Sequence, residues 1–112
     1  MIMTVKTLIE EFSLEVLCGA ELAEEKQITG GYCGDLLSWV MSKAKEGDCW
    51  LTVMGNVNSV GVAVLADVAC ILLTENAVFD DDALTRAKQN GVIVLRSAES
   101  AFDLGARIAK LI

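Results

Sequence analysis

Short apolar segments alternate with helical segments through the second half of the chain, and this alternation limits the possible fold more than any other feature. The apolar runs are CWLTVM at 49–54, ACILLT at 69–74 and VIVLRS at 92–97. They have the length of strands, and the helices between them return the chain so that successive strands run parallel. Consecutive apolar positions indicate strands covered on both faces. The sequence therefore predicts an α/β domain with a mainly parallel sheet of about five strands and helices in two outer layers.

Helical spacing and capping residues divide the rest of the chain. The predicted helices cover residues 4–12, 35–47, 57–68, 80–91 and 97–112, and two further strands cover residues 14–18 and 27–34. We expect Asp35 to cap the second helix, Asn58 or Ser59 to cap the third, and Ser97 or Ser100 to cap the last. The strand at 27–34 is expected to run into a glycine bend. One domain over residues 1–112 is predicted from this length.

Charge and hydropathy exclude some partners and favour others. The net charge is −7 and the nine basic residues are scattered, so a nucleic-acid surface is not expected. Residues 49–66 are uncharged, but polar residues interrupt the run, which predicts a buried core rather than a membrane span. An acidic N-terminal segment without a signal peptide predicts a cytoplasmic protein. The mean hydropathy of +0.49 predicts an exposed apolar patch and hence a homodimer.

Few residues suggest catalysis or metal binding. The chain has no histidine, and its four cysteines form no Cys-x-x-Cys pair. Cys49 and Cys70 fall in predicted strands, where a reduced cysteine packs as a small apolar residue. The acidic run at 80–82 fits the positive end of a helix dipole better than a metal site. We therefore expect no enzyme activity, metal or cofactor.

Loops that follow the strands hold the candidate ligand-binding residues, because open parallel sheets bind ligands at the carboxyl ends of their strands. The candidates are Gly30, Gly31, Asp35, Gly55, Asn56, Asn58, Ser59, Thr74, Asn76 and Arg96. Gly55 and Asn56 precede a helix whose exposed amides suit an anion, and Arg96 is the cation of this set. The alternative is that these small polar residues only turn the chain.

The order of segments from GGYCGDLLSW through DCWLTVMGNVNS and ILLTEN to GVIVLRSAESAFDLGARI resembles the DRTGG domain family. The resemblance covers roughly residues 13–112. The Asp-Arg pair and the Gly-Gly that name the family are replaced here by Gly55-Asn56 and, after Thr74, by Glu75-Asn76. Family positions match Gly30, Gly31, Asp35, Asn58 and Thr74.

This resemblance implies a three-layer α/β/α domain similar to the N-terminal domain of HPr kinase/phosphorylase. Relatives accompany phosphotransacetylase, CBS pairs and regulated pyrophosphatases, which implies a regulatory role and help in forming dimers. Two hypotheses remain open. The chain is a non-catalytic, homodimeric module that binds a small anion such as an adenine nucleotide, or it is a protein-interaction subunit without a ligand, accessory to an iron-hydrogenase or signalling system. A small transferase is a third, less supported hypothesis.

Overall fold

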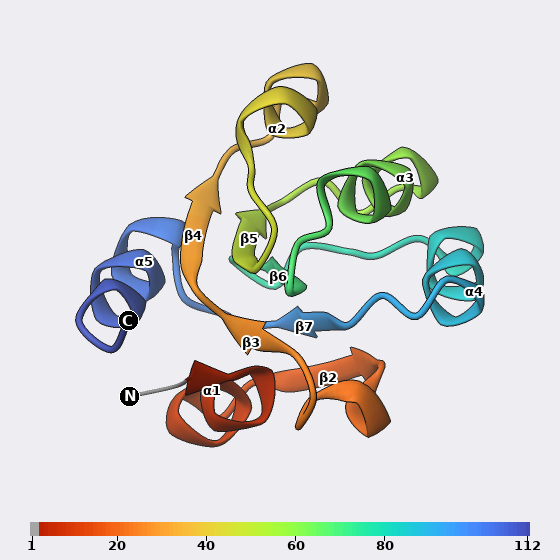
Figure 1. Cartoon of the computed structure of the whole chain (residues 1–112). Helices are drawn as coiled ribbons and strands as arrows, with labels where there is room; N and C mark the ends of the chain where they lie inside the picture. The colour runs from red at the N-terminus through yellow and green to blue at the C-terminus, as the bar shows by residue number, and fades with distance from the viewer. Residues whose placement is uncertain (1–2) are drawn as a thin grey trace.

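The computed structural model describes residues 3–112 as alternating short strands and helices (Figure 1). The strands are β1 (Met3–Thr4), β2 (Glu15–Cys18), β3 (Gln27–Ile28), β4 (Gly30–Cys33), β5 (Asp48–Thr52), β6 (Cys70–Leu73) and β7 (Val94–Arg96). The helices are α1 (Val5–Phe12), α2 (Leu37–Lys43), α3 (Val57–Ala66), α4 (Asp81–Gln89) and α5 (Ala101–Ala109), with a 3-10 turn at Ala20–Leu22.

A five-stranded sheet forms the middle layer, in the order β2-β7-β6-β5-β4. Strands β4, β5, β6 and β7 are parallel, and β2 is antiparallel to β7. Helices α2, α3 and α4 cover one face of the sheet, and α1 and α5 cover the other (Figure 1). A separate antiparallel pair joins β1 to β3. The predicted three-layer α/β/α fold with a mainly parallel sheet is therefore confirmed.

Alternate residues of the central strands supply two hydrophobic cores, as the period of a strand requires. Cys49 and Leu51 of β5 face the layer of α1 and α5, where Leu104 and Ile108 pack against them. Trp50 lies between them in sequence and faces the opposite core, which α2, α3 and α4 cover. Trp50 is completely buried, and its indole Nε1 donates to the carbonyl oxygen of Gly34 at 2.9 Å.

Side-chain caps fix where three of the helices begin. Thr4, Asn56 and Ser100 each accept a hydrogen bond from the backbone N–H three residues ahead, at the start of α1, α3 and α5. Helix α3 is therefore capped two or three residues earlier than we predicted, by Asn56 rather than Asn58 or Ser59. The expected Asp35 cap of α2 is also wrong, because Leu36 occupies that position and no side chain caps the helix.

The glycine bend predicted at the end of the strand at 27–34 is also wrong. Gly30 and Gly31 lie inside β4 and pair with Asp48 and Cys49 of β5. A side chain on Gly30 would begin 2.7 Å from Oδ1 of Asp48, so a close neighbour on β5 explains this glycine. Among residues 3–112, none of the helices is long and apolar enough to cross a membrane.

Candidate functional site

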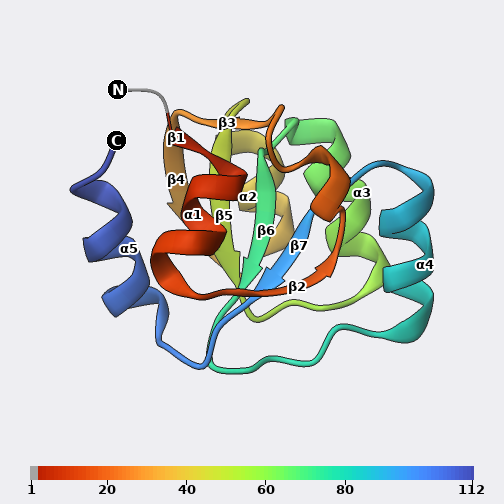
Figure 2. The same cartoon turned by 90° about the horizontal axis from the view of Figure 1, so that it is seen from below.

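Most of the predicted site residues gather at one edge of the sheet, which we call the carboxyl rim: the loops after β4, β5, β6 and β7. In Figure 2, β5, β6 and β7 point toward this edge, and the loops that follow them run along it. The rim and the element ends that border it hold Asp35, Gly55, Asn56, Asn58, Ser59, Thr74, Asn76 and Arg96, of which Asn58 and Ser59 lie in the first turn of α3 and Arg96 ends β7. Gly30 and Gly31 are not part of it, because they lie within β4.

Hydrogen bonds between loops hold the rim together. Oδ1 of Asp35 accepts from the Thr52 hydroxyl at 2.7 Å and from the Val53 backbone N–H at 3.0 Å. The Ser59 hydroxyl, which is completely buried, donates to the carbonyl oxygen of Met54 at 2.7 Å. These contacts stabilise the turn between β5 and α3 and occupy polar atoms that sequence reasoning had offered to a ligand.

Gly55 is needed for close packing against a neighbouring loop. A side chain there would overlap the carbonyl oxygen of Val78, and the Gly55 carbonyl accepts from the Asp80 N–H at 2.7 Å. Asn76, in contrast, has a left-handed backbone (φ 54°), and its N–H donates to the carbonyl oxygen of Ser97. The loop after β6 is thereby bound to the loops on both sides of it.

Arg96 is already paired with an acidic residue. Its guanidinium donates through Nε and Nη2 to the two carboxylate oxygens of Glu15, each at 3.0 Å, and through Nη1 to the Ala77 carbonyl. Bidentate pairing of this kind is the strong form of an arginine–carboxylate contact. An anion at the rim would have to compete with Glu15 for this side chain.

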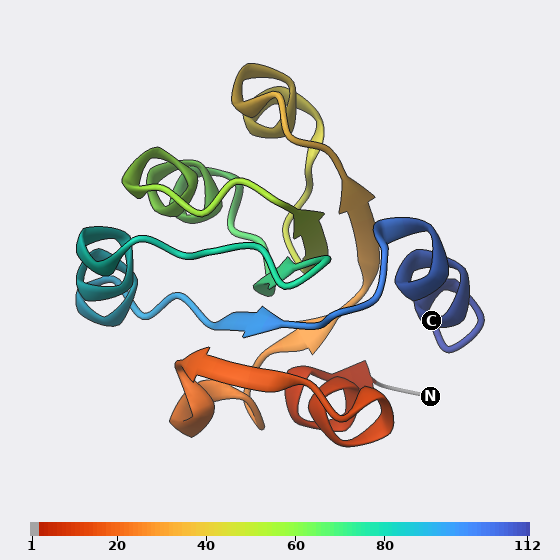
Figure 3. The ribbon, with the colours of Figure 1, turned by 180° about the vertical axis from the view of Figure 1, so that it is seen from behind.

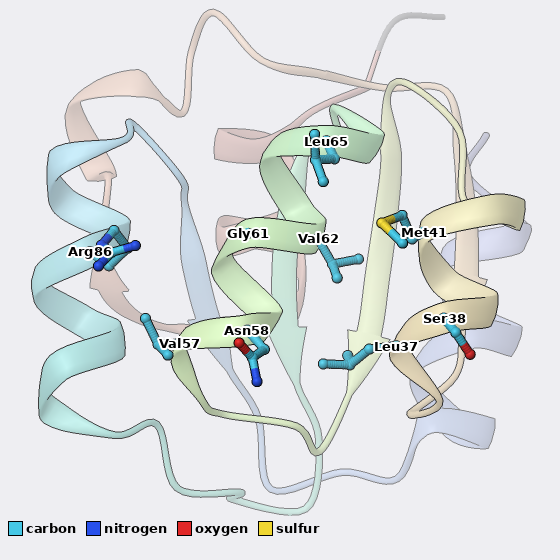
Figure 4. Close-up of a pocket in the computed structure, with 9 residues that line it drawn as sticks. All are labelled: Leu37, Ser38, Met41, Val57, Asn58, Gly61, Val62, Leu65 and Arg86. Carbon is cyan, nitrogen blue, oxygen red and sulfur yellow. The ribbon is translucent and has the colours of Figure 1, made fainter.

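A groove lies beside the rim, on the outer face of the helical layer that α2, α3 and α4 form. We call it the helical-face groove, and Figure 4 shows its lining: Leu37, Ser38, Met41, Val57, Asn58, Gly61, Val62, Leu65 and Arg86. Its volume is about 550 Å³. Leu37 and Met41 of α2 point toward α3 (Figure 4), and Gly61 of α3 has no side chain and lies beside open space. Asn58 belongs to both the rim and the groove.

Arg86 is the charged residue of the groove lining. It is exposed, and among residues 3–112 its side chain makes no salt bridge. The other lining residues are apolar, apart from the hydroxyl of Ser38 and the amide of Asn58. The groove thus combines an apolar wall with one cation and two hydrogen-bonding groups.

Gly61 has no packing reason to be glycine within the described chain. A side chain there would meet nothing within 4 Å, although glycine lowers helix stability by about 0.5–1 kcal/mol relative to alanine. Sequence reasoning missed Gly61 and Arg86. A glycine within a helix that carries no charge was the sequence signal that could have identified Gly61. Nothing near Arg86 in the sequence indicates that this residue faces α3.

A family model described as the DRTGG domain matches residues 7–111. Among solved structures, the chain is similar to the CBS and DRTGG domains of the regulatory region of Clostridium perfringens pyrophosphatase, solved with the activator diadenosine tetraphosphate. The TM-score is 0.72 at 15% identity, over 92% of this chain and 44% of that chain. The likeness is one of fold, and this chain spans less than half of that relative. A comparison with curated proteins finds no match.

Proposed function

This chain belongs to the DRTGG domain family, and on that premise we propose that it is a non-catalytic, homodimeric regulatory domain that binds an adenine nucleotide in the helical-face groove. DRTGG domains are regulatory, and the solved relative lies in the regulatory region of an enzyme. The observation that carries the proposal is the lining of the groove, which is mostly apolar and includes the Arg86 guanidinium, a group that makes no salt bridge among residues 3–112.

The groove matches the two halves of a nucleotide. Leu37, Met41 and Val62 provide apolar contact for an adenine ring, and Arg86 provides a cation for phosphate oxygens. The volume of about 550 Å³ falls in the usual range of small-molecule sites. The relative's complex with a dinucleotide activator supports this choice of ligand class. Ligand contact by the other rim residues and by Gly30 and Gly31 stays a prediction.

Calorimetric titration with ATP, ADP, AMP and diadenosine tetraphosphate tests the ligand. We expect heat with at least one nucleotide, and we expect Arg86→Gln to weaken that binding roughly tenfold or more, because a hydrogen bond to a charged group contributes about 1.5–3 kcal/mol. Lys88→Gln is the matched control, since Lys88 is an exposed cation on the same helix outside the groove lining. The nucleotide affinity of Lys88→Gln should stay within about twofold of the wild-type affinity.

One combined result would contradict nucleotide binding. No heat with any of these nucleotides, together with a melting temperature that none of them raises, removes the nucleotide from the proposal. The second candidate then stands: an interaction subunit whose groove receives a protein. Val64 and Leu65, which are 46% and 73% exposed on α3, favour that candidate.

A further inference from the structure

A smaller cavity, which we call the α5 cavity, lies between β4 and α5. Figure 3 shows α5 alongside β4, on the side of that strand away from α3 and α4. The cavity has a volume of about 270 Å³. It shares no lining residue with the helical-face groove, and its lining contains no charged side chain. The lining residues are Gly31, Cys33, Leu51, Gly105, Ile108, Ala109 and Ile112.

Two glycines, one on each element, leave this space unfilled. A side chain at Gly31 would begin 3.6 Å from the Cys49 carbonyl oxygen, and one at Gly105 would begin 3.7 Å from Sγ of Cys33, which are ordinary contact distances. Neither glycine has the left-handed backbone that favours this residue. Gly105 also lies within α5, where glycine lowers helix stability relative to alanine. Close packing and turn geometry therefore explain neither glycine.

The α5 cavity has an apolar floor and an open mouth. Leu51 and Ile108 are each 2% exposed and belong to the core under α1 and α5. Cys33, Ala109 and Ile112 are exposed. Partial burial raises the pKa of the Cys33 thiol, so this thiol is uncharged at neutral pH. Because a charged group pays a large cost where it has no partner, this lining favours an uncharged ligand.

Strand β4 adds backbone hydrogen-bonding groups to the wall of the cavity. It is the edge strand of the sheet, and the Gly34 N–H donates to the Leu51 carbonyl of β5. Backbone groups of successive residues alternate between the two sides of a strand, so those of Gly31 and Cys33 are directed away from β5. An edge strand leaves such groups without a ladder partner. The two residues whose N–H and C=O groups are free of the ladder are thus the two that line the cavity.

The volume indicates the size of a ligand. An apolar cavity of about 150 Å³ holds a benzene ring, so the larger α5 cavity has room for two fused rings. Sulfur makes favourable contacts with aromatic rings, and Sγ of Cys33 lies at the wall. Size, lining and sulfur together favour an aromatic ligand over an aliphatic one.

We propose that the α5 cavity binds a small uncharged aromatic heterocycle, whose rings lie between Gly31 and Gly105 and whose ring N–H donates to an outward carbonyl of β4. Leu51 and Ile108 contact the ring face. This site is separate from the proposed nucleotide site, because the helical-face groove lies on the other helical layer.

Titration with indole tests the site, with calorimetry for affinity and methyl NMR for location. We expect a dissociation constant of about 0.1–1 mM, as is usual for a ligand of this size. The methyl resonances of Leu51 and Ile108 should shift, whereas those of Val62, in the helical-face groove, should not. We expect 1-methylindole, which lacks the N–H donor, to bind roughly threefold more weakly or worse.

Substitution of Gly105 tests whether the unfilled space is the site. Gly105→Leu is expected to weaken indole binding at least tenfold, because the new side chain occupies the cavity. Ala106→Leu is the matched control, since Ala106 is exposed on the same helix outside the lining, and its indole affinity should stay within about twofold of the wild type. Gly105→Ala provides a milder change that should raise the melting temperature by roughly 2–5 °C and still weaken binding.

Four results would overturn the inference. The first is the absence of Leu51 and Ile108 shifts at about 2 mM indole, a concentration above the expected dissociation constant. The second is wild-type indole affinity in folded Gly105→Leu or, if that variant does not fold, in Gly105→Ala. The third is equal affinity for indole and 1-methylindole. The fourth is binding that weakens as the protein concentration rises, which would assign the cavity to a second copy of the chain. Failure of nucleotide binding leaves all four measurements unchanged, because the two sites share no residue.

Discussion

At the scale of single residues, Asp35 links the end of β4 to the end of β5. Its carboxylate accepts hydrogen bonds from the Thr52 hydroxyl and the Val53 N–H, and the Thr52 hydroxyl in turn accepts from the Met54 N–H at 3.1 Å. Thr52 is 2% exposed, so the loss of its partner would leave a buried hydroxyl short of one hydrogen bond. Asp35 therefore stabilises the turn that begins α3.

Removal of this carboxylate should destabilise the protein. Asp35→Ala is expected to lower the free energy of unfolding by about 1–2 kcal/mol, and Asp35→Asn by less, because an amide oxygen still accepts hydrogen bonds. Glu25→Ala, a surface carboxylate change, should stay within about 0.5 kcal/mol of the wild type. Urea denaturation measures all three. Equal stability of Asp35→Ala and the wild type would mean that these hydrogen bonds contribute nothing.

At the scale of elements, α3 has two glycine-dependent features with opposite physical reasons. Gly55 precedes the helix and lies against the backbone of Val78, whereas Gly61 is in mid-helix beside open space. The first glycine is required by packing within the chain. The second lowers the surface of the helix and forms the middle of the helical-face groove.

Alanine at these two positions should change stability in opposite directions. Gly61→Ala is expected to raise the free energy of unfolding by about 0.5–1 kcal/mol, through helix propensity alone. Gly55→Ala is expected to lower it by about 1–3 kcal/mol or more, because the new methyl group overlaps the Val78 carbonyl. Thermal and urea denaturation of both variants provide the comparison. A destabilised Gly61→Ala would mean that the new methyl group meets a neighbouring atom instead of open space.

At the scale of the whole molecule, two hydrophobic cores lie on opposite faces of one sheet. Cys49 and Cys70 lie side by side in the core under α1 and α5, with their sulfur atoms 3.7 Å apart and no exposed surface. The hydrogen bond between the Cys49 and Cys70 thiols, together with burial, raises the pKa of the Cys49 thiol well above its ordinary value. Cys33 lies on the β4 edge and is exposed, and partial burial raises the pKa of its thiol as well.

Thiol labelling should therefore separate local exposure from global unfolding. In the native protein, Ellman's reagent is expected to modify Cys33 only, while Cys18, Cys49 and Cys70 react at the rate of global unfolding. A raised pKa leaves less thiolate at a given pH, so Cys33 should react more slowly at pH 8 than an unfolded cysteine and accelerate as the pH rises. Cys33→Ser should abolish the fast phase. A fast phase of two or more thiols would contradict this burial.

The sequence by itself determined the class of fold, the family and the approximate place of each helix and strand, because apolar periodicity and capping residues act between near neighbours. Ser100, for example, caps α5 as one of the two predicted residues, through a contact with the backbone three residues away. Most of the carboxyl rim was also predictable, since parallel strands bring their ends to one edge.

Only the tertiary structure decided what those residues contact. Arg96 pairs with Glu15 across 81 positions of sequence, and Asp35 binds the end of the next strand instead of capping α2. Gly30 and Gly31 are strand residues because β5 lies beside them, which no local pattern encodes. The helical-face groove likewise depends on which elements become neighbours. Such contacts are set by the packing of segments distant in sequence, whereas local periodicity specifies only the segments themselves.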